Sequence, residues 1–164
     1  MNAMAKFKIP GSFVVDRVDL TTREVAYGKH WGWLDDSAIV QIYMRKMQAG
    51  RPLLDVEERW ALALSEEIRS GDLPDLSSED LGDSRELSAV WIYLSLAWLH
   101  QSGLSEQQLF NVIEELYSDF EYPEEMEGFV KYMPPPPGGK GGISGMAERL
   151  EAFLRYSEDL YRQR

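Results

Sequence analysis

The chain has 164 residues and a formal net charge of −11, a length that allows one domain with its own buried core. Its hydrophobic content of 44% and aromatic content of 12% argue against a disordered chain, and the absence of cysteine excludes disulfides and thiolate metal sites. The longest apolar run, residues 89–99, is shorter than the roughly 20 residues that span a bilayer. No basic stretch followed by an apolar one starts the sequence, so we expect no secretion by a signal peptide. We therefore expect a cytoplasmic protein without a membrane-spanning segment.

The N-terminal part of the sequence predicts little regular structure before its first capping motif. Residues 1–12 are expected to form a flexible N-terminus, which can include a cloning remnant, and residues 13–164 a single helical domain. Pro10-Gly11 is a turn signal, and the Phe-Val-Val that follows favours a short strand within otherwise irregular backbone. Thr21 and Glu24 have the spacing of a capping box, which predicts that a short helix begins there.

Two further helical segments are predicted in the next part of the chain. Residues 35–37 offer N-caps for a helix that runs to Gly50, a residue typical of the position after a helix C-terminus. Asp55 and Glu58 repeat the capping-box spacing and predict a second segment that continues to Gly71. The short connection between these segments is typical of two antiparallel helices.

The central helix of the fold is predicted at about residues 84–101. Its apolar residues occur on nearly all sides, which is typical of a helix in the middle of a domain. A capping pattern at Ser105 begins the next helix, Pro123 suits the first position of a short one, and residues 133–143 form a Pro/Gly-rich loop before a last helix from about Ser144. These segments predict an all-α fold, a single compact domain of six to seven helices around the central apolar helix.

The negative charge is concentrated in one part of the chain. Residues 76–137 carry two basic and twelve acidic side chains, which accounts for nearly the whole excess. Such a field repels nucleic acid and anionic membranes and favours encounter with basic proteins. Solubility alone is the alternative explanation, because charge runs usually form solvated faces.

Motifs for catalysis or metal binding are weak in this sequence. His30 and His100 lie at predicted helix ends, where a histidine interacts favourably with the helix dipole, and neither has the glutamate three residues earlier that di-metal bundles use. Glu115 and Asp119 lie one helical turn apart and are a possible carboxylate pair for a divalent cation or for acid–base chemistry. We predict a non-catalytic protein with no cofactor and no metal, and keep a carboxylate-based enzyme as an alternative.

The acidic segment contains the candidate contact site. Aromatic residues beside carboxylates suit a contact with a basic protein, in which aromatic side chains act as buried anchors. Most of these aromatics have the spacing of core residues, whereas Tyr122 and Tyr132 are expected to be exposed at one edge. The predicted partner-binding residues are Glu115, Asp119, Glu121, Tyr122, Glu124 and Glu125.

Two blocks of the sequence resemble a known family. The block IEELYSDFEYPEEMEGFVKYMPP, residues 113–135, resembles the bacterial family catalogued as domain of unknown function 2247. The block EVAYGKHWGWLDDSAIV, residues 24–40, is similar to the opening helix of the same family. The order and spacing of the two blocks extend the resemblance over most of residues 13–162.

The resemblance implies a role but no catalytic residues. Members resemble single cytoplasmic domains, and some are proposed from gene neighbourhood to be immunity proteins of bacterial polymorphic toxin systems. Such a protein binds its cognate toxin domain and blocks it, and the acidic segment is compatible with a basic toxin cleft. A homodimeric structural or scaffold protein is a further alternative.

Overall fold

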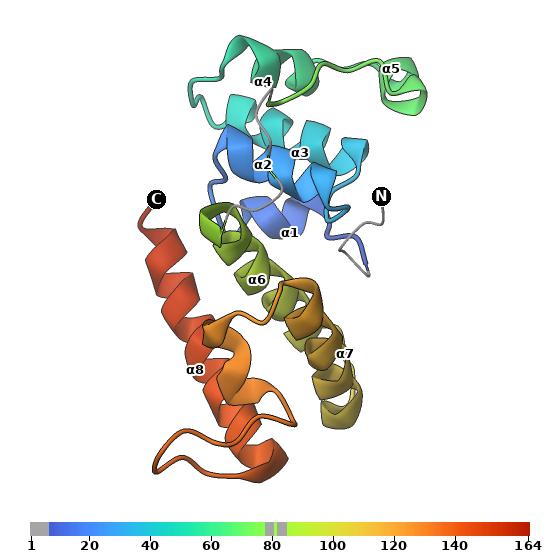
Figure 1. The fold of residues 1–164 in the computed structure, drawn as a ribbon. Helices are drawn as coiled ribbons and strands as arrows, with labels where there is room; N and C mark the ends of the chain where they lie inside the picture. The colour runs from blue at the N-terminus through green and yellow to red at the C-terminus, as the bar shows by residue number, and fades with distance from the viewer. Residues whose placement is uncertain (1–6, 78–80, 82–84) are drawn as a thin grey trace. The chain divides into compact units, whose positions relative to one another are not determined.

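A computed structural model describes residues 7–77, 81 and 85–164 of the chain. Within these residues all regular elements are helices and no strand occurs, which confirms the all-α prediction (Figure 1). The helices are α1 (Gly11–Val15), α2 (Thr22–His30), α3 (Asp36–Gln48), α4 (Asp55–Ala61), α5 (Ser65–Ser70), α6 (Arg85–His100), α7 (Glu106–Asp119), the 3-10 helix η1 (Glu124–Phe129) and α8 (Gly142–Arg162).

The contacts of the chain group into two compact units. The first comprises residues 1–91 together with Arg164, and the second comprises residues 92–163. Helix α6 contributes to both, because the boundary falls after Trp91. The predicted division into a flexible segment, 1–12, and one helical domain stays a prediction, and residues 1–6 lie outside the described residues.

Tryptophans dominate the core of the first unit. Trp33 and Trp91 are fully buried, and their rings stack with centroids 6.4 Å apart. The indole N–H of Trp91 donates to the carbonyl oxygen of Glu24 at 2.9 Å, which satisfies the polar atom of a buried side chain. Gly28 allows this approach, because a Cβ there would overlap the ring of Trp91.

The prediction of irregular or extended backbone around Phe7–Leu20 is wrong at its centre. Residues Gly11–Val15 form α1, which begins after Pro10 and packs on α3. A Cβ at Gly11 would overlap the carbonyl oxygen of Ala38, so the two helices meet at close range. Phe13 and Val14 are buried in this contact region, and tertiary packing therefore overrides the strand preference of the Phe-Val-Val run.

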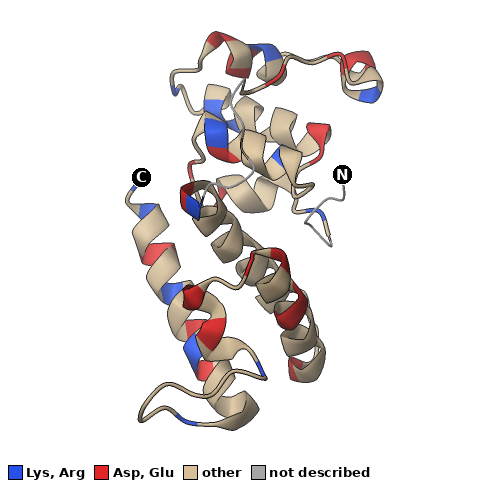
Figure 2. Ribbon diagram, in the orientation of Figure 1, with Lys and Arg blue, Asp and Glu red and all other residues tan. Residues whose placement is uncertain are grey.

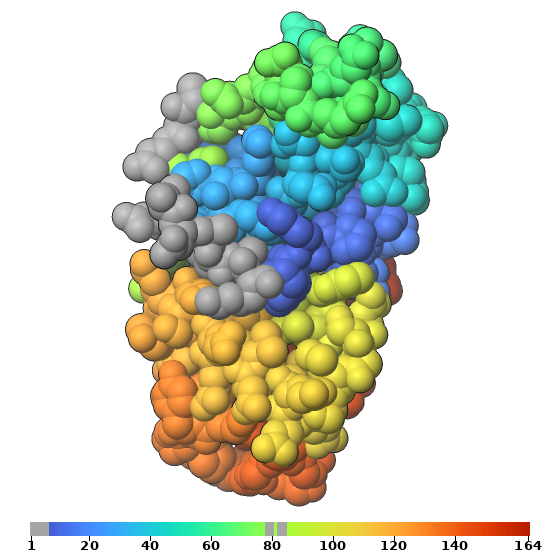
Figure 3. Space-filling view, turned by 90° about the vertical axis from the view of Figure 1, so that its right-hand side faces the viewer, coloured from blue at the N-terminus to red at the C-terminus, as the bar shows by residue number. Residues whose placement is uncertain are grey.

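The segment predicted to continue from Asp55 to Gly71 forms two short helices. Helix α4 begins one residue earlier than predicted, because the Glu57 carboxylate accepts from the Leu54 N–H at 2.9 Å. The Glu67 carboxylate accepts from the Leu64 N–H in the same way and begins α5. None of the residues of α5 is buried, and its side chains cover part of the surface in Figure 3.

Helix α6 agrees with the predicted central helix. Residues 90–96 are all buried in it, and Val90, Trp91, Leu94 and Leu96 have no exposed surface. Its last residue, His100, is exposed at the C-terminus. The N-cap predicted for this helix at Asp83 or Ser84 lies outside the described residues.

In the second unit η1 packs on α8 and on α7. The rings of Phe129 in η1 and Phe153 in α8 lie with centroids 5.5 Å apart. Pro123 is the N-cap of η1 rather than its first helical residue, and the segment behind it is a 3-10 helix. The Pro/Gly-rich loop is present before α8, which begins at Gly142, two residues earlier than predicted.

Candidate functional site

The predicted contact residues lie at the end of α7, in the turn that follows and in η1. Helix α7 begins at a capping box, in which the Ser105 hydroxyl accepts from the Gln108 N–H and the Gln108 side chain accepts from the Ser105 N–H. Its buried stripe includes Ile113, Leu116 and Tyr117, so the intervening carboxylates face outward. Figure 2 shows acidic residues along α7 and in η1.

A turn with unusual backbone geometry ends α7. Glu121 and Tyr122 both have φ = 61°, the left-handed conformation that favours glycine. The Tyr122 N–H donates to the Tyr117 carbonyl at 2.8 Å and the Glu121 N–H donates to the Ser118 carbonyl at 3.0 Å, the two bonds of a Schellman motif. Each left-handed residue costs about 1–2 kcal/mol, so the packing of this turn must offset that cost.

Three tyrosines cluster at this turn. The ring of Tyr117 meets that of Tyr122 edge-on at 5.2 Å and that of Tyr132 at 6.0 Å and 55°. Tyr117 is only 4% exposed, whereas Tyr122 and Tyr132 are 60% and 59% exposed. The prediction that Tyr122 and Tyr132 are exposed is therefore confirmed. Both exposed rings pack on the buried ring of Tyr117.

Carboxylates surround the tyrosine cluster. Burial raises the pKa of the Tyr117 phenol, and the negative charge of Glu127 raises it further. Partial burial also raises the pKa of Tyr132, with Tyr122 and Glu114 adding to the rise. Burial is the larger cause of both pKa shifts, and the acids Glu127 and Glu114 add a smaller electrostatic contribution.

The acids at the turn form no ion pairs within the described part of the chain. Glu121, Glu124 and Glu125 are exposed, and no ion pair there includes them. The nearby Lys131 pairs with Glu114 at 4.0 Å instead. We define the acidic–aromatic face as Glu121, Tyr122, Glu124, Glu125 and Tyr132.

The other two predicted contact residues lie further back on α7. Glu115 is exposed and Asp119 is half-buried. Neither residue belongs to a metal-binding group, because no set of three or more potential side-chain ligands gathers among the described residues. Tyr132, which the predicted set omits, is as exposed as Tyr122. Its contact with Tyr117 was not predicted because Tyr132 lies thirteen residues after the end of α7.

A buried carboxylate in the first unit was not predicted. Glu57 is 2% exposed and accepts from the Thr22 hydroxyl at 2.8 Å and from the Leu54 N–H at 2.9 Å. Lys46 pairs with it at 3.5 Å. Burial raises the pKa of the Tyr43 phenol, and the charge of Glu57 adds to the rise. The Glu57 carboxylate therefore links α4 to Thr22 of α2 and to Lys46 of α3. These partners satisfy its oxygens, as a buried structural carboxylate requires.

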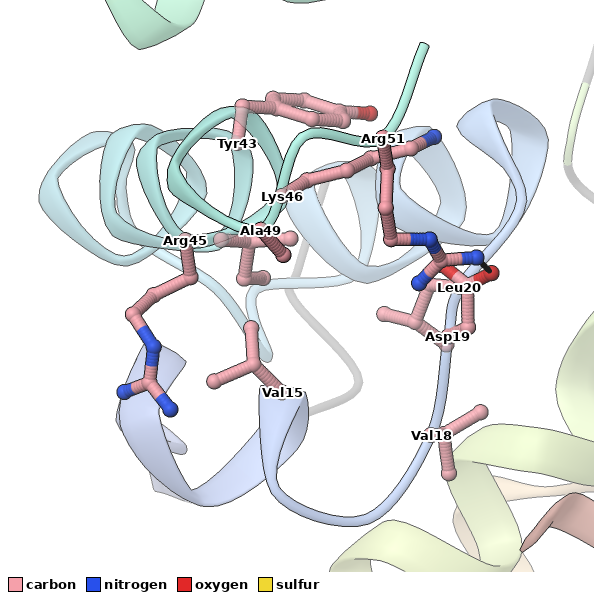
Figure 4. Close-up of a pocket in the computed structure, with 10 residues that line it drawn as sticks. Val15, Val18, Asp19, Leu20, Tyr43, Arg45, Lys46, Ala49 and Arg51 are labelled. Carbon is pink, nitrogen blue, oxygen red and sulfur yellow. Dashed lines mark hydrogen bonds and ion pairs between the residues drawn. The ribbon is translucent and has the colours of Figure 1, made fainter. Parts of the chain in front are cut away.

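A pocket of about 190 Å³ lies in the first unit between α1, the segment after it and the C-terminal half of α3. Its apolar lining includes Val15, Val18, Leu20 and Ile42, and its cationic lining consists of Arg45, Lys46 and Arg51. Figure 4 shows Arg51 joined to Asp19 at one side of the pocket. We call this cavity the α1–α3 pocket.

A comparison with protein families decides the relationship that the sequence blocks suggested. The model of a family described as "Uncharacterized protein conserved in bacteria (DUF2247)" matches residues 11–158. The chain belongs to this family. No curated protein and no solved structure matches the chain.

Both candidate sites of this DUF2247 protein lie inside the matched region. The acidic–aromatic face ends at Tyr132 and the α1–α3 pocket begins at Val15. The family description assigns no activity to either site. In the described part of the DUF2247 chain, each helix is too short or too polar to cross a bilayer.

Proposed function

We propose that this DUF2247 protein binds a basic protein partner through its acidic–aromatic face and acts by occluding that partner. The observation that carries the proposal is the pair of exposed rings, Tyr122 and Tyr132, in a segment whose exposed acids Glu121, Glu124 and Glu125 form no ion pair with the described residues. Exposed aromatic residues of this kind are typical anchors of protein interfaces.

The two parts of the face have different physical tasks. A tyrosine offers a large contact area with few rotatable bonds, so little conformational entropy is lost when it is buried by a partner. The contacts of Tyr122 and Tyr132 with Tyr117 reduce that loss further. The carboxylates act at longer range, because complementary charge mainly raises the association rate.

The family resemblance points to the kind of partner. An immunity protein must cover the working surface of a toxin domain, and a toxin that acts on nucleic acid presents a basic cleft. An acidic face with aromatic anchors is complementary to such a cleft. We therefore propose a toxin domain encoded beside the gene of this protein as the partner.

Association kinetics test the proposal. The probe is the proposed partner, a toxin domain encoded beside this gene, and the variant combines Glu121→Lys, Glu124→Lys and Glu125→Lys. We expect this variant to associate at least tenfold more slowly at low salt and to lose most of the salt dependence of the association rate.

The matched control carries the same change in net charge on acids that do not belong to the face. Glu58→Lys, Glu66→Lys and Glu151→Lys alter three exposed acids on α4, α5 and α8. This control should associate much faster than the first variant. Equal rates for the two variants would show that only total charge matters, and the proposed face would then be wrong.

The alternatives receive less support. A homodimer is favoured by the exposed leucines Leu54, Leu62 and Leu64, which are 59%, 56% and 67% exposed. Sedimentation velocity at several concentrations tests it directly. The enzyme alternative rests on Glu115 and Asp119 and stays a prediction.

A further inference from the structure

We propose that the α1–α3 pocket is a binding site for a small amphipathic anion, a short aliphatic chain that ends in a carboxylate. The pocket lies in the first unit and takes no part in the acidic–aromatic face. The inference is therefore independent of the proposed function.

The lining of the pocket suits an aliphatic group. Val18, Leu20 and Ile42 are buried side chains, and Val15 adds a half-buried wall from α1. Apolar surface that a ligand covers here is removed from water, which favours binding of an aliphatic group. The volume of about 190 Å³ lies below the roughly 300–1,000 Å³ of sites for drug-sized molecules, so only a small ligand fits.

The cations of the pocket come from a basic segment of an acidic chain. Residues 37–51 contain Arg45, Lys46 and Arg51 and no acidic residue, in a chain whose net charge is −11. All three cations line the pocket, and each pairs with a carboxylate, Arg45 with Asp16, Lys46 with Glu57 and Arg51 with Asp19. The guanidinium N–H donors that these pairs leave unused favour an anion over an amine as ligand.

The ion pairs at the pocket leave the arginines able to bind a ligand. Arg45 pairs with Asp16 at 3.2 Å and Arg51 pairs with Asp19, and both arginine side chains are nearly half exposed. Exposed pairs of this kind contribute little to stability, so exchange with a ligand carboxylate costs little. A guanidinium also has five N–H donors, and one aspartate uses only part of them.

A carboxylate with an aliphatic tail uses both kinds of lining. Acetate carries the charge but reaches little apolar surface, while hexylamine carries the tail with the wrong charge. Inorganic phosphate offers charge alone. These three compounds therefore separate the two contributions when they are compared with hexanoate.

The first experiment is a titration of the full-length protein, labelled with ¹⁵N, with each of the four compounds. Hexanoate should shift the amide signals of residues 15–20 and 42–51, with an affinity at least tenfold higher than that of acetate, phosphate or hexylamine. An equal response to hexanoate and acetate, or shifts located elsewhere, would overturn the proposal.

Variants test the two halves of the pocket separately. Arg51→Met should weaken hexanoate binding about tenfold, the loss expected for one charge-assisted hydrogen bond. The matched control Arg59→Met removes an exposed arginine that pairs with Glu67 outside the pocket, and it should leave the affinity unchanged.

Ala49→Leu fills the pocket and leaves its charges in place. Figure 4 shows Ala49 among the lining residues at the end of α3. This variant should also weaken hexanoate binding at least tenfold, and its fold can be checked by circular dichroism. If Arg51→Met and Ala49→Leu both bind hexanoate as the wild type does, the pocket is not the binding site.

Discussion

At the scale of single residues, the left-handed turn at the end of α7 makes a prediction about stability. Glu121 has φ = 61° at the position where a Schellman motif favours glycine. Glu121→Gly should stabilise the protein by roughly 0.5–1 kcal/mol, because the relief of left-handed strain exceeds the added entropy of the unfolded chain. Urea denaturation measures the change.

The control for this prediction is Glu125→Gly. Glu125 is an exposed acid in η1 without a positive φ, so glycine there should lower stability or leave it unchanged. A loss of stability in Glu121→Gly similar to that of the control would show that the turn carries no strain at Glu121.

A second residue-scale prediction concerns the glycine under a tryptophan. A Cβ at Gly28 would overlap three ring atoms of Trp91, and Trp91 is itself fully buried. Gly28→Ala should therefore destabilise the protein by about 1–3 kcal/mol, the usual cost of overpacking. Gly141→Ala is the control, because its added Cβ would meet no atom within 4 Å and its φ is −79°. Thermal unfolding of the two variants should differ clearly.

At the scale of elements, Arg149 holds the loop before α8. Its guanidinium donates to the carbonyl oxygens of Gly128 in η1 and of Lys140 in the Pro/Gly-rich loop, the latter at 2.7 Å. Arg149→Met should increase hydrogen exchange in η1 and speed proteolysis within residues 133–141, because both segments lose the same anchor. Arg155→Met on the same helix is the control, since Arg155 is exposed and no partner is found for it within the described residues. Equal exchange in the two variants would contradict the anchoring role.

Helices were predictable where their caps are local. Thr21, Asp35 and Ser105 cap α2, α3 and α7 as the sequence predicts, because these bonds join residues three apart. Helix α1 was missed because its formation depends on a close contact with α3. The starts of α4 after Leu54 and of α5 after Leu64 were not predicted, because a leucine side chain offers no hydrogen-bond acceptor. The carboxylates of Glu57 and Glu67 alone make the side-chain caps of these helices.

The two candidate sites differ in how much of each could be predicted from the sequence. The acidic part of the contact face is visible as a run of carboxylates in residues 113–127. The tyrosine cluster and the α1–α3 pocket depend on contacts between residues that are distant in the chain, such as Val15 with the end of α3. Periodicity reports which face of a helix is buried, but it does not report which side chains from other elements meet there.

At the scale of the whole molecule, the buried phenol of Tyr43 predicts how stability depends on pH. Its folded-state pKa is raised, mainly by burial and further by Glu57, above the ordinary value of 10.0. The unfolded chain therefore releases this proton first, so the stability present below pH 10 is lost as the pH rises. The loss should approach about 1.4 kcal/mol per pH unit for this one group.

Denaturation between pH 9 and pH 11 measures this loss. Tyr43→Phe removes the titrating group and should flatten the fall in unfolding free energy with pH, even if the variant is less stable at pH 7. Tyr156→Phe is the control, because Tyr156 is 68% exposed. The unfolding free energy of this variant should fall with pH at the wild-type slope. If Tyr43→Phe also has the wild-type slope, the alkaline loss arises elsewhere, for instance from Tyr117 and Tyr132, whose pKa values are raised as well.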